Sequence, residues 1–385
     1  VFDTGSTNIW ISSDLCERGA CAEEDRQRYN HTKSVTFNYP KHATRLGVEF
    51  GTGTLSGPVG KDDLHIGPFA VFQQTFGMIQ DQTGTVFEEV PFEGIVGLAF
   101  PAMSANRVTP FFDTVIGQKA LEHNEFSFYF SRYTPAANAI FWGGVEPGFY
   151  KGVIEYFPVV DPYYWGVELH SFKIGDECLL GSDPECTAQP AEPQGFFSAF
   201  SFVQLDQKSQ SSNAANDWST ARARQMSGEP NPPKAILDSG TTYFTAEKNV
   251  YEEIMQRIPI APCSEVTGET HKPLTYTLKS AAGNLRDFVF THDMYMAAKG
   301  TGEQAECLPA FMQINVPKQH GPAMVLGDVF FRYYYAVFDR ADGEGTNARL
   351  GLAPSLHTKD VLQKLRTLTH DQPSFQQAHE AKLRM

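Results

Sequence analysis

The sequence predicts a mainly β protein made of two related halves, and three observations support this fold class. The stretch 1–7, VFDTGST, returns as ILDSGTT at 236–242, so that each copy has two apolar residues, Asp, a hydroxyl residue, Gly, a hydroxyl residue and Thr. An apolar strand that ends in Gly follows both copies at nearly the same distance, at Gly97 and at Gly327. The 32 Gly, 24 Pro, 30 Phe and 15 Tyr, with few long periodic apolar stretches, favour strands and turns.

The repeated motif predicts how its aspartates are held. Its apolar pair is typical of the end of a buried strand, and its Gly predicts a tight turn, because Gly takes a positive φ without steric cost. A single Asp in such a turn could simply shape the turn. Two of them in matching frames, Asp3 and Asp238, indicate two carboxylates that internal two-fold symmetry brings together.

At these residues the sequence resembles the pepsin-like aspartic endopeptidases, from Val1 to about Pro354. The resemblance implies an all-β, bilobal acid protease fold with pseudo-two-fold symmetry and a substrate cleft between the lobes. We accordingly expect an N-terminal β lobe over 1–160, a C-terminal β lobe over 161–355 and a helical tail over 356–385. The motifs that carry the resemblance are DTGS with NIW at 3–10, FGTG at 50–53, FEGIVGLA at 92–99, DSGTT at 238–242, LGDVF at 326–330, YAVFDR at 335–340 and GLAP at 351–354.

Several elements of the first lobe have clear sequence signals. Alternating apolar residues around FGTG predict a β-hairpin over 45–66, which matches the flap that closes over substrate in this family. A short helix is expected over 110–119, with Thr109 as its N-cap and Pro110 at its first position. Strands are expected over 126–130 and 139–144.

The second lobe begins with a strand expected over 164–169. From 187 to 233 the pattern gives way to Ser, Gln, Asn and Pro, which predicts an insertion that is mostly a mobile loop. A helix is expected over 246–258. The tail has an apolar face that predicts an amphipathic helix, which either packs on its own protein or docks a partner or propeptide. That face is formed by Val361, Leu362, Leu365 and Leu368.

The paired aspartates predict a specific chemistry. Two carboxylates within a few Å cannot both ionise at low cost, so a dyad of Asp3 and Asp238 would keep one proton. The ionised member would take a proton from a bound water that attacks the scissile carbonyl, while the protonated member donates a hydrogen bond to the carbonyl oxygen. This reaction requires neither a metal nor a cofactor, and we expect neither.

The residues that flank the dyad receive supporting roles from the resemblance, in pairs that the repeat relates. A first pair of hydroxyls orients the outer carboxylate oxygens, a second pair cross-links the two turns, and two glycines let the backbone approach the catalytic water. These pairs are Ser6 with Thr241, Thr4 with Ser239, and Gly5 with Gly240.

Substrate contacts are expected from the flap and from the walls of the cleft. Phe50, Gly51 and Thr52 form the flap tip, where the family usually has a Tyr whose hydroxyl bonds toward the indole that matches Trp10. Phe50 lacks that hydroxyl, which predicts a looser or differently latched flap and is similar to the apicomplexan aspartic proteases of the plasmepsin IX and X type. Apolar walls that would favour apolar or aromatic side chains beside the cut are expected from Val1, Trp10, Phe87, Phe92, Ile95, Tyr164 and Ile236.

Composition and motifs argue against several other classes of protein. The net charge of −14 disfavours nucleic acid or an anionic membrane as the main partner, and no stretch reaches the roughly 18 apolar residues of a membrane span. The sequence has no His-Glu-x-x-His, Gly-x-Ser-x-Gly, Walker or Gly-x-Gly-x-x-Gly motif. The six cysteines form no Cys-x-x-Cys, so a metal site is not expected, although their spacing leaves many pairings open.

The resemblance also implies how the chain is processed. It implies the disulfides Cys16–Cys21, Cys178–Cys186 and Cys263–Cys307, which are typical of an oxidising compartment. The sequon at Asn30 predicts N-glycosylation. Val1 already lies in the strand that carries the first aspartate, whereas the family has further strands, a prosegment and a signal peptide before it. We therefore expect a chain that lacks its N-terminal part.

These inferences together predict a monomeric aspartic endopeptidase that cuts extended polypeptides at acidic pH. Its expected partners are polypeptide substrates and a propeptide outside this chain. Its expected setting is the secretory pathway, an acidic endosome-like or vacuolar compartment, or the cell exterior, where it would process secretory proteins. The alternative is a peptide-binding protein on the same fold that has lost catalysis; the intact Asp and Gly of both motifs favour the enzyme.

Overall fold

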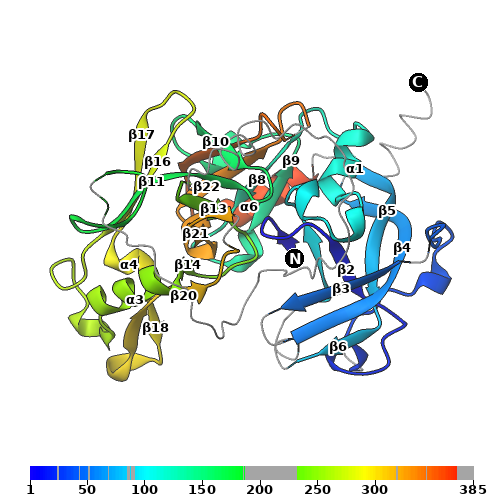
Figure 1. Ribbon diagram of the computed structural model, residues 1–385, viewed down its shortest axis with the longest axis horizontal. Coiled ribbons are helices and arrows are strands. Elements are labelled where there is room, and N and C mark those ends of the chain that lie inside the picture. Colours follow the sequence, from blue (N-terminus) through cyan, green and yellow to red (C-terminus); the bar gives the residue numbers. More distant parts are fainter. Residues whose placement is uncertain are drawn as a thin grey trace.

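The structure is a computed structural model with two large sheets, one mostly from each half of the chain (Figure 1). In Figure 1 the blue strands of the first half gather on one side, and the green to gold elements of the second half lie on the other. Mainly β structure is what the sequence predicts. The residues that the structure describes are 1–23, 26–42, 44–50, 53–67, 69–84, 87, 92–184, 186, 232–317, 320–343 and 345–370, so nearly all of the predicted insertion lies outside them.

The first sheet has the strands β1 Phe2–Asp3, β2 Ile9–Ser12, β3 Arg45–Phe50, β4 Gly53–Ile66, β5 Phe69–Ile79, β6 Asp81–Thr83 and β7 Gly94–Gly97. Their order is β1-β7-β2-β5-β4-β3, and β6 pairs with β4. Strands β3 and β4 pair antiparallel with Phe50 opposite Gly53, so the hairpin predicted over 45–66 is present. The hairpin residues Gly51 and Thr52, and the side chain of Phe50, lie outside the described residues.

The second sheet follows the path β20-β14-β21-β13-β11-β10-β23-β22-β8-β9, with β12 and β16 pairing with β11, and β17 with β16. Its strands are β8 Glu125–Tyr129, β9 Ala139–Trp142, β10 Glu155–Asp161, β11 Gly166–Ile174, β12 Glu177–Leu180, β13 Lys234–Leu237, β14 Phe244–Glu247, β16 Leu274–Lys279, β17 Leu285–Phe290, β20 Phe311–Ile314, β21 Ala323–Leu326, β22 Tyr334–Asp339 and β23 Arg349–Pro354. A smaller sheet, in the order β15-β19-β18, contains β15 Ala261–Pro262, β18 Met296–Lys299 and β19 Glu306–Pro309.

Strands β8 and β9 connect the two halves of the chain. They come from the first 160 residues, but β8 pairs with β22, so both belong to the second sheet. The division into lobes at residue 160 therefore stays a prediction. The strand expected from 164 begins only at Gly166, because Tyr163 and Tyr164 both donate their backbone N–H to the carbonyl oxygen of Asp161 in a turn.

The internal repeat is visible in the strand pairing. In the first half β1 runs parallel to β7, and β2 pairs antiparallel with β7 and parallel with β5. In the second half β13 runs parallel to β21, and β14 pairs antiparallel with β21 and parallel with β20. The strands that lead into the two aspartates thus occupy equivalent places in equivalent arrangements, which confirms the pseudo-two-fold fold predicted from the repeat.

The glycine that follows each motif copy is explained by close backbone packing. A Cβ at Gly97 would overlap the backbone of Thr7, and a Cβ at Gly327 would overlap the carbonyl oxygens of Thr241 and Tyr243. Only a residue without a side chain lets the strand pass directly behind the motif turn. The Gly at the end of the apolar strand that follows each motif copy is therefore explained by the contact of β7 or β21 with the motif turn.

Helices are short within the described part of the chain. They are α1 Phe111–Gly117, α3 Lys248–Arg257, α4 His292–Tyr295, α5 Asp328–Phe331 and α6 Val361–His370. Single 3-10 turns lie at Ala20–Ala22, His31–Lys33, Pro101–Met103, Ala105–Arg107, Pro135–Ala137, Pro147–Phe149, Cys263–Glu265 and Gly302–Gln304. The prediction of Thr109 as the N-cap of α1 was wrong by one residue. Pro110 is the N-cap, because it has extended φ/ψ and its carbonyl oxygen accepts from the N–H of Thr114.

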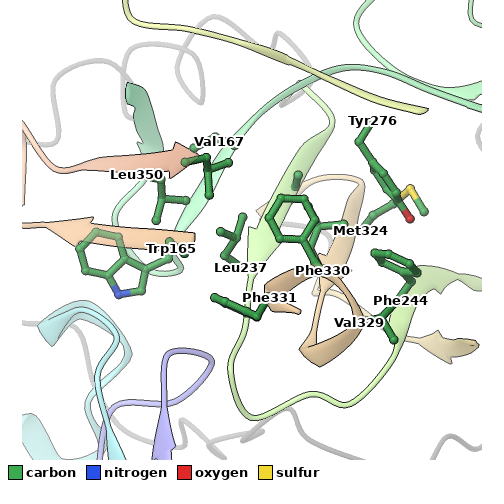
Figure 2. Close-up of a cluster of buried hydrophobic side chains, with 14 of the residues drawn as sticks. Trp165, Val167, Leu237, Phe244, Tyr276, Met324, Val329, Phe330, Phe331 and Leu350 are labelled. Carbon is green, nitrogen blue, oxygen red and sulfur yellow. The ribbon is translucent and has the colours of Figure 1, made fainter. Parts of the chain in front are cut away.

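The main apolar core holds the strand that carries the second aspartate. Leu237 of β13 is fully buried among Met324 of β21, Val167 of β11 and Phe330 of α5 (Figure 2). All four residues of β13 are buried. Each apolar side chain of this size contributes about 1.5–3 kcal/mol when it is fully buried, so the end of β13 has a fixed position.

The tail helix α6 packs on its own protein, which is the first of the two alternatives. Val361 is buried beside Tyr129, Phe149 and Tyr335. The remaining members of its apolar face, Leu362, Leu365 and Leu368, are partly buried against the same cluster. No helix within the described residues has the length and apolar character needed to cross a lipid bilayer.

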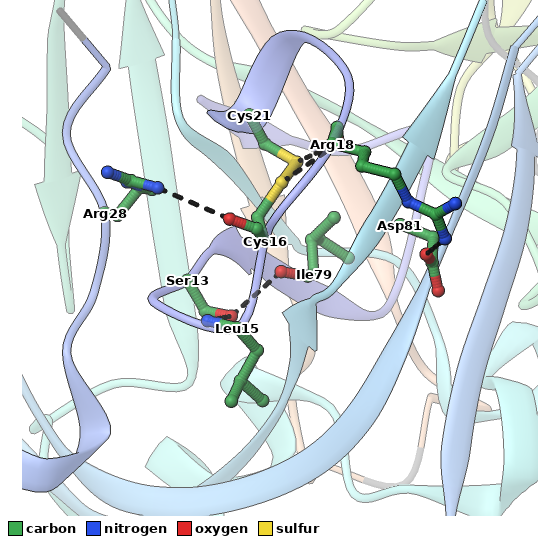
Figure 3. Close-up of a disulfide and its surroundings, with 8 residues drawn as sticks. All are labelled: Ser13, Leu15, Cys16, Arg18, Cys21, Arg28, Ile79 and Asp81. Carbon is green, nitrogen blue, oxygen red and sulfur yellow. Dashed lines mark hydrogen bonds and ion pairs between the residues drawn. A yellow bond between two sulfur atoms is a disulfide. The ribbon is translucent and has the colours of Figure 1, made fainter. Parts of the chain in front are cut away.

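The three disulfides join the cysteines that the resemblance pairs: Cys16 with Cys21, Cys178 with Cys186 and Cys263 with Cys307. Figure 3 shows the first of them, which closes a loop directly after β2. At the base of this loop Ser13 Oγ donates to the carbonyl oxygen of Ile79, at 2.8 Å. The loop is thereby fixed to the end of β5.

Candidate active site

The two motif turns are joined by reciprocal hydrogen bonds between distant parts of the chain. Thr4 Oγ1 donates to the carbonyl oxygen of Leu237 at 2.9 Å and accepts from the backbone N–H of Ser239 at 3.0 Å. Ser239 Oγ donates to the carbonyl oxygen of Phe2 at 2.9 Å and accepts from the backbone N–H of Thr4 at 3.1 Å. Each hydroxyl therefore bridges to the opposite half, and the four bonds lock the two strand ends together.

Each aspartate is also held inside its own turn. The N–H of Gly5 donates to Asp3 Oδ1 at 2.8 Å, and the hydroxyl of Ser6 donates to Oδ2. In the second turn the N–H of Gly240 donates to Asp238 Oδ1 at 2.8 Å, and Thr241 Oγ1 donates to Asp238 Oδ2 at 2.6 Å. Both carboxyl groups belong to residues that are almost fully buried, with 4% of Asp3 and 1% of Asp238 exposed.

The motif glycines show how the two carboxyl groups lie relative to each other. A Cβ at Gly5 would overlap the carboxyl group of Asp238, and a Cβ at Gly240 would overlap that of Asp3. Neither glycine has a positive φ, so the prediction that they are needed for a positive φ was wrong. Their role in letting the backbone approach the catalytic water stays a prediction. Glycine is required here because the carboxyl group of the opposite half occupies the space of a side chain. Each carboxyl group therefore packs against the turn that holds the other.

The environment of Asp238 favours its protonated form. Burial raises the pKa of Asp238 well above its ordinary value, and the charge of Asp3 and a side-chain hydrogen bond with Asp3 add to the rise. The hydrogen bonds from Thr241 and from the N–H of Gly240 oppose it without cancelling it. A buried pair of carboxyl groups that face each other therefore retains a proton at pH values where an isolated aspartate has lost it.

Four predicted wall residues of the first half form one apolar cluster beneath the hairpin of β3 and β4. Trp10 of β2 is buried, with its ring edge-on to Phe87 at 6.5 Å and tilted to Phe92 at 6.4 Å between ring centroids. Ile95 of β7 is buried in the same cluster. The inner face of the hairpin completes it with Leu46, Val48, Leu55 and Val59.

The predicted wall residues of the second half lie beside Asp238. Tyr164 and Ile236 are buried in one small cluster together with Met103 and Val325. Burial raises the pKa of Tyr164 above its ordinary value, and the charges of nearby groups, Asp238 among them, contribute to the rise. The charge of Asp238 therefore affects the ionisation of the Tyr164 hydroxyl, which places Tyr164 near the second aspartate.

Val1 takes a different place from the other predicted wall residues. It is 48% exposed and lines a pocket of about 490 Å³ together with Phe2, Ser239 and residues of β8 and β9. Its role toward a substrate stays a prediction.

The sequon residue Asn30 is half-buried, and its side-chain oxygen accepts from the N–H of Thr32 at 3.0 Å and from Thr32 Oγ1 at 2.7 Å. N-glycosylation at Asn30 stays a prediction too.

Two residues that hold the site in place were missed in the sequence. Trp165 Nε1 donates to the carbonyl oxygen of Leu98 at 3.0 Å, in the buried region directly behind the first motif turn. Arg26 donates to the carbonyl oxygen of Phe87 at 2.9 Å and pairs with Glu93 at 3.4 Å. The aromatic run at 163–165 was a signal for the first of these; nothing in the local sequence marks Arg26.

Among the described residues, no three His, Cys, Asp or Glu side chains gather where they could hold a metal ion.

Comparison with known proteins assigns the family. The model of the eukaryotic aspartyl protease family matches residues 1–188 and 199–355, which is most of the chain. The chain belongs to the eukaryotic aspartyl protease family. This result confirms the resemblance stated from the two motif copies and the bilobal β fold that it implies.

Several relatives resemble this aspartyl protease family member over most of its length. It is 32% identical to aspartic protease 3 of Toxoplasma gondii, over 97% of this chain and 50% of that protein. It is 31% identical to plasmepsin IX of Plasmodium falciparum, over 96% of this chain and 60% of that protein. It is 30% identical to cathepsin D of Clupea harengus, over 92% of this chain and 77% of that protein. The chain thus spans only 50 to 60% of the first two relatives.

Proposed function

We propose that this protein is an aspartic endopeptidase that hydrolyses peptide bonds with a water molecule activated by Asp3 and Asp238. The observation that carries the proposal is the mutual packing of the two motif turns, in which each glycine faces the carboxyl group of the opposite half. Such a pair shares one proton and offers a base and an acid at the same place. The names of the relatives as aspartic protease, plasmepsin and cathepsin D support the same activity.

The proposed reaction uses both members of the pair. Because burial and the neighbouring Asp3 raise the pKa of Asp238, the pair retains one proton in the free protein, and its other member is ionised. The ionised carboxylate takes a proton from the water as the water attacks the scissile carbonyl carbon. The protonated carboxyl group donates a hydrogen bond to the carbonyl oxygen as negative charge develops there. Ser6 and Thr241 orient the pair through the outer oxygens.

The proposed substrate is an extended polypeptide that lies between the hairpin and the dyad. The cluster of Trp10, Phe87, Phe92 and Ile95 on one side, and that of Tyr164 and Ile236 on the other, favours apolar or aromatic side chains beside the cut. The setting that fits best is an acidic compartment of the secretory pathway, because three disulfides indicate an oxidising environment. There the enzyme would process secretory proteins.

The second candidate function is peptide binding without catalysis on the same fold. The intact hydrogen-bond sets around both aspartates disfavour it, because a binding protein has no need to hold both carboxyl groups in this geometry. The test uses the full-length, processed protein with an unfolded protein substrate at acidic pH. We expect cleavage that pepstatin inhibits, and loss of cleavage in Asp238→Ala with the fold retained. Absence of cleavage by the processed protein would leave only the binding function.

A further inference from the structure

A charged cluster of the half-buried Asp161 with the buried Lys234 and His320 lies beside the second half of the site. Asp161 Oδ2 is 2.9 Å from Lys234 Nζ and 3.0 Å from His320 Nδ1. Lys234 is only 2% exposed and His320 only 7%. Burial raises the pKa of Asp161, but the hydrogen bond from His320 and the charge of Lys234 outweigh it and hold this pKa below its ordinary value. The carboxylate is therefore ionised and accepts from Nδ1–H of His320.

The cluster joins three segments that border the proposed active site. Asp161 ends β10 and begins the turn that carries Tyr164. Lys234 begins β13, the strand that ends next to Asp238, and it lies opposite Ala323 of β21. His320 belongs to the loop that enters β21. The carboxylate of Asp161 thus connects the Tyr164 turn, the start of β13 and the loop that leads into β21.

His320 also contacts the tyrosines of the turn directly. Its ring lies 4.3 Å from that of Tyr163, tilted by 30°, and 5.2 Å from that of Tyr164, nearly perpendicular to it. The Tyr164 turn is therefore held at its base by hydrogen bonds to Asp161 and at its side by an aromatic ring. Tyr164 belongs to the same buried cluster as Ile236 of β13, so the turn packs beside the strand that carries Asp238.

We propose that Asp161, Lys234 and His320 are positioning residues that fix Tyr164 and the end of β13 for the reaction at Asp238. Stability alone does not account for such a cluster, because a buried ion pair replaced by apolar residues is often neutral or stabilising. A buried charged pair does fix relative position, since its hydrogen bonds tolerate little displacement. A misplacement of about 1 Å near reacting groups costs on the order of 10²-fold in rate. The inference rests on the proposed peptidase function.

The test compares variants that change the cluster in steps. Lys234→Met keeps the aliphatic stem and removes the charge, and Lys234→Met with Asp161→Asn removes the whole ion pair. His320→Phe keeps a ring beside Tyr163 without the hydrogen bond, and His320→Asn restores a donor near the place of Nδ1. The matched control is Arg257→Met, which removes the ion pairs of Arg257 with the exposed Glu177 and Glu253 in the same half. For each protein kcat, KM and the midpoint of thermal unfolding are measured with one apolar peptide substrate.

We expect kcat/KM of Lys234→Met to fall about 10- to 100-fold, mainly through kcat. The double variant should regain thermal stability relative to Lys234→Met, yet keep the low kcat. His320→Asn should retain more activity than His320→Phe, and Arg257→Met should match the wild type. If kcat per folded molecule is unchanged in Lys234→Met and in the double variant while only the unfolding midpoint moves, the cluster is structural and the inference is overturned.

The outcome also separates this inference from the proposed function. An active wild type with unchanged variants overturns the positioning role alone. If the wild type binds the peptide but does not cleave it, the peptidase proposal fails, and the Kd of the same peptide tests the cluster instead. An unchanged Kd in Lys234→Met overturns the positioning role. A higher Kd, which means weaker binding, supports it. A wild type that neither cleaves nor binds removes both proposals.

Discussion

The hydroxyl of Thr4 donates to the backbone oxygen of Leu237, 2.9 Å away and 233 residues further along the chain. Thr4 is fully buried, so its hydroxyl has no access to water. Neither half of the chain can satisfy this group by itself, because its partners belong to the other half. The geometry of the two aspartates is therefore a property of the assembled pair of turns, and the predictions below test that dependence.

Removal of the Thr4 hydroxyl should destabilise the protein. In Thr4→Val the carbonyl oxygen of Leu237 and the N–H of Ser239 lose a buried partner, which costs about 1–3 kcal/mol per unpaired group. Thr4→Ser retains the hydroxyl and should recover most of the loss. The free energy of unfolding in denaturant measures both. Thr54→Val, which removes an exposed hydroxyl pair with Thr83, is the control and should change it by less than about 0.5 kcal/mol.

A methyl group on either motif glycine should separate the carboxyl groups. In Gly5→Ala the new Cβ overlaps the carboxyl group of Asp238, so the two turns must move apart. We expect peptide cleavage to fall by on the order of 10²-fold or more, because the pair no longer holds one proton between its members. Gly144→Ala is the control, since nothing lies within 4 Å of the position of its Cβ. Full activity in Gly5→Ala would show that the two carboxyl groups need not face each other.

Stability should depend on pH through Asp238. Its pKa in the folded protein is raised above the ordinary 3.8, so the folded state binds more protons than the unfolded state between the two values. The stabilising effect of protonation is therefore complete below pH 3.8 and is lost as pH rises through the raised pKa. Asp238→Asn lacks this loss.

The measurement is the unfolding midpoint of the wild type and of Asp238→Asn at a series of pH values from 3 to 7. The midpoint of the variant relative to the wild type should rise as pH rises over this range. A difference between the two proteins that stays constant with pH would contradict the raised pKa. The Arg257→Met variant serves as the comparison, because it removes ion pairs with the exposed Glu177 and Glu253 and leaves both aspartates unchanged.

The disulfides should differ in their contribution to stability. Cys263–Cys307 closes a loop of 44 residues in sequence separation, and Cys16–Cys21 closes one of 5. Loop-closure entropy in the unfolded chain predicts losses of about 4 and about 2 kcal/mol when each pair is replaced by Ser. The free energy of unfolding under non-reducing conditions tests the order. A larger loss from the Cys16 pair would contradict the entropic account and indicate that the loop of Figure 3 matters through its native contacts.

Much of the site was predictable because its residues lie in short sequence motifs that occur in both halves of the chain. The two Asp motifs and the glycines that follow them occur in both halves, and each pattern carries its own turn and strand chemistry. The hairpin of β3 and β4 was likewise visible from alternation around its tip. The close packing at Gly5 was not predictable: the sequence suggested a positive φ, whereas the structure places the carboxyl group of Asp238 in the space of a Cβ.

The sequence by itself determined which strands end in an acid and which residue types surround that acid, since these follow from neighbours within a few positions. Only the tertiary structure decided that β8 joins β22, that Pro110 rather than Thr109 caps α1, and that Lys234 and His320 meet at Asp161. The physical reason is burial. Strand packing and the need of buried polar groups for hydrogen-bond partners decide which residues far apart in the chain come into contact. The spacing of residues along the sequence does not predict these contacts.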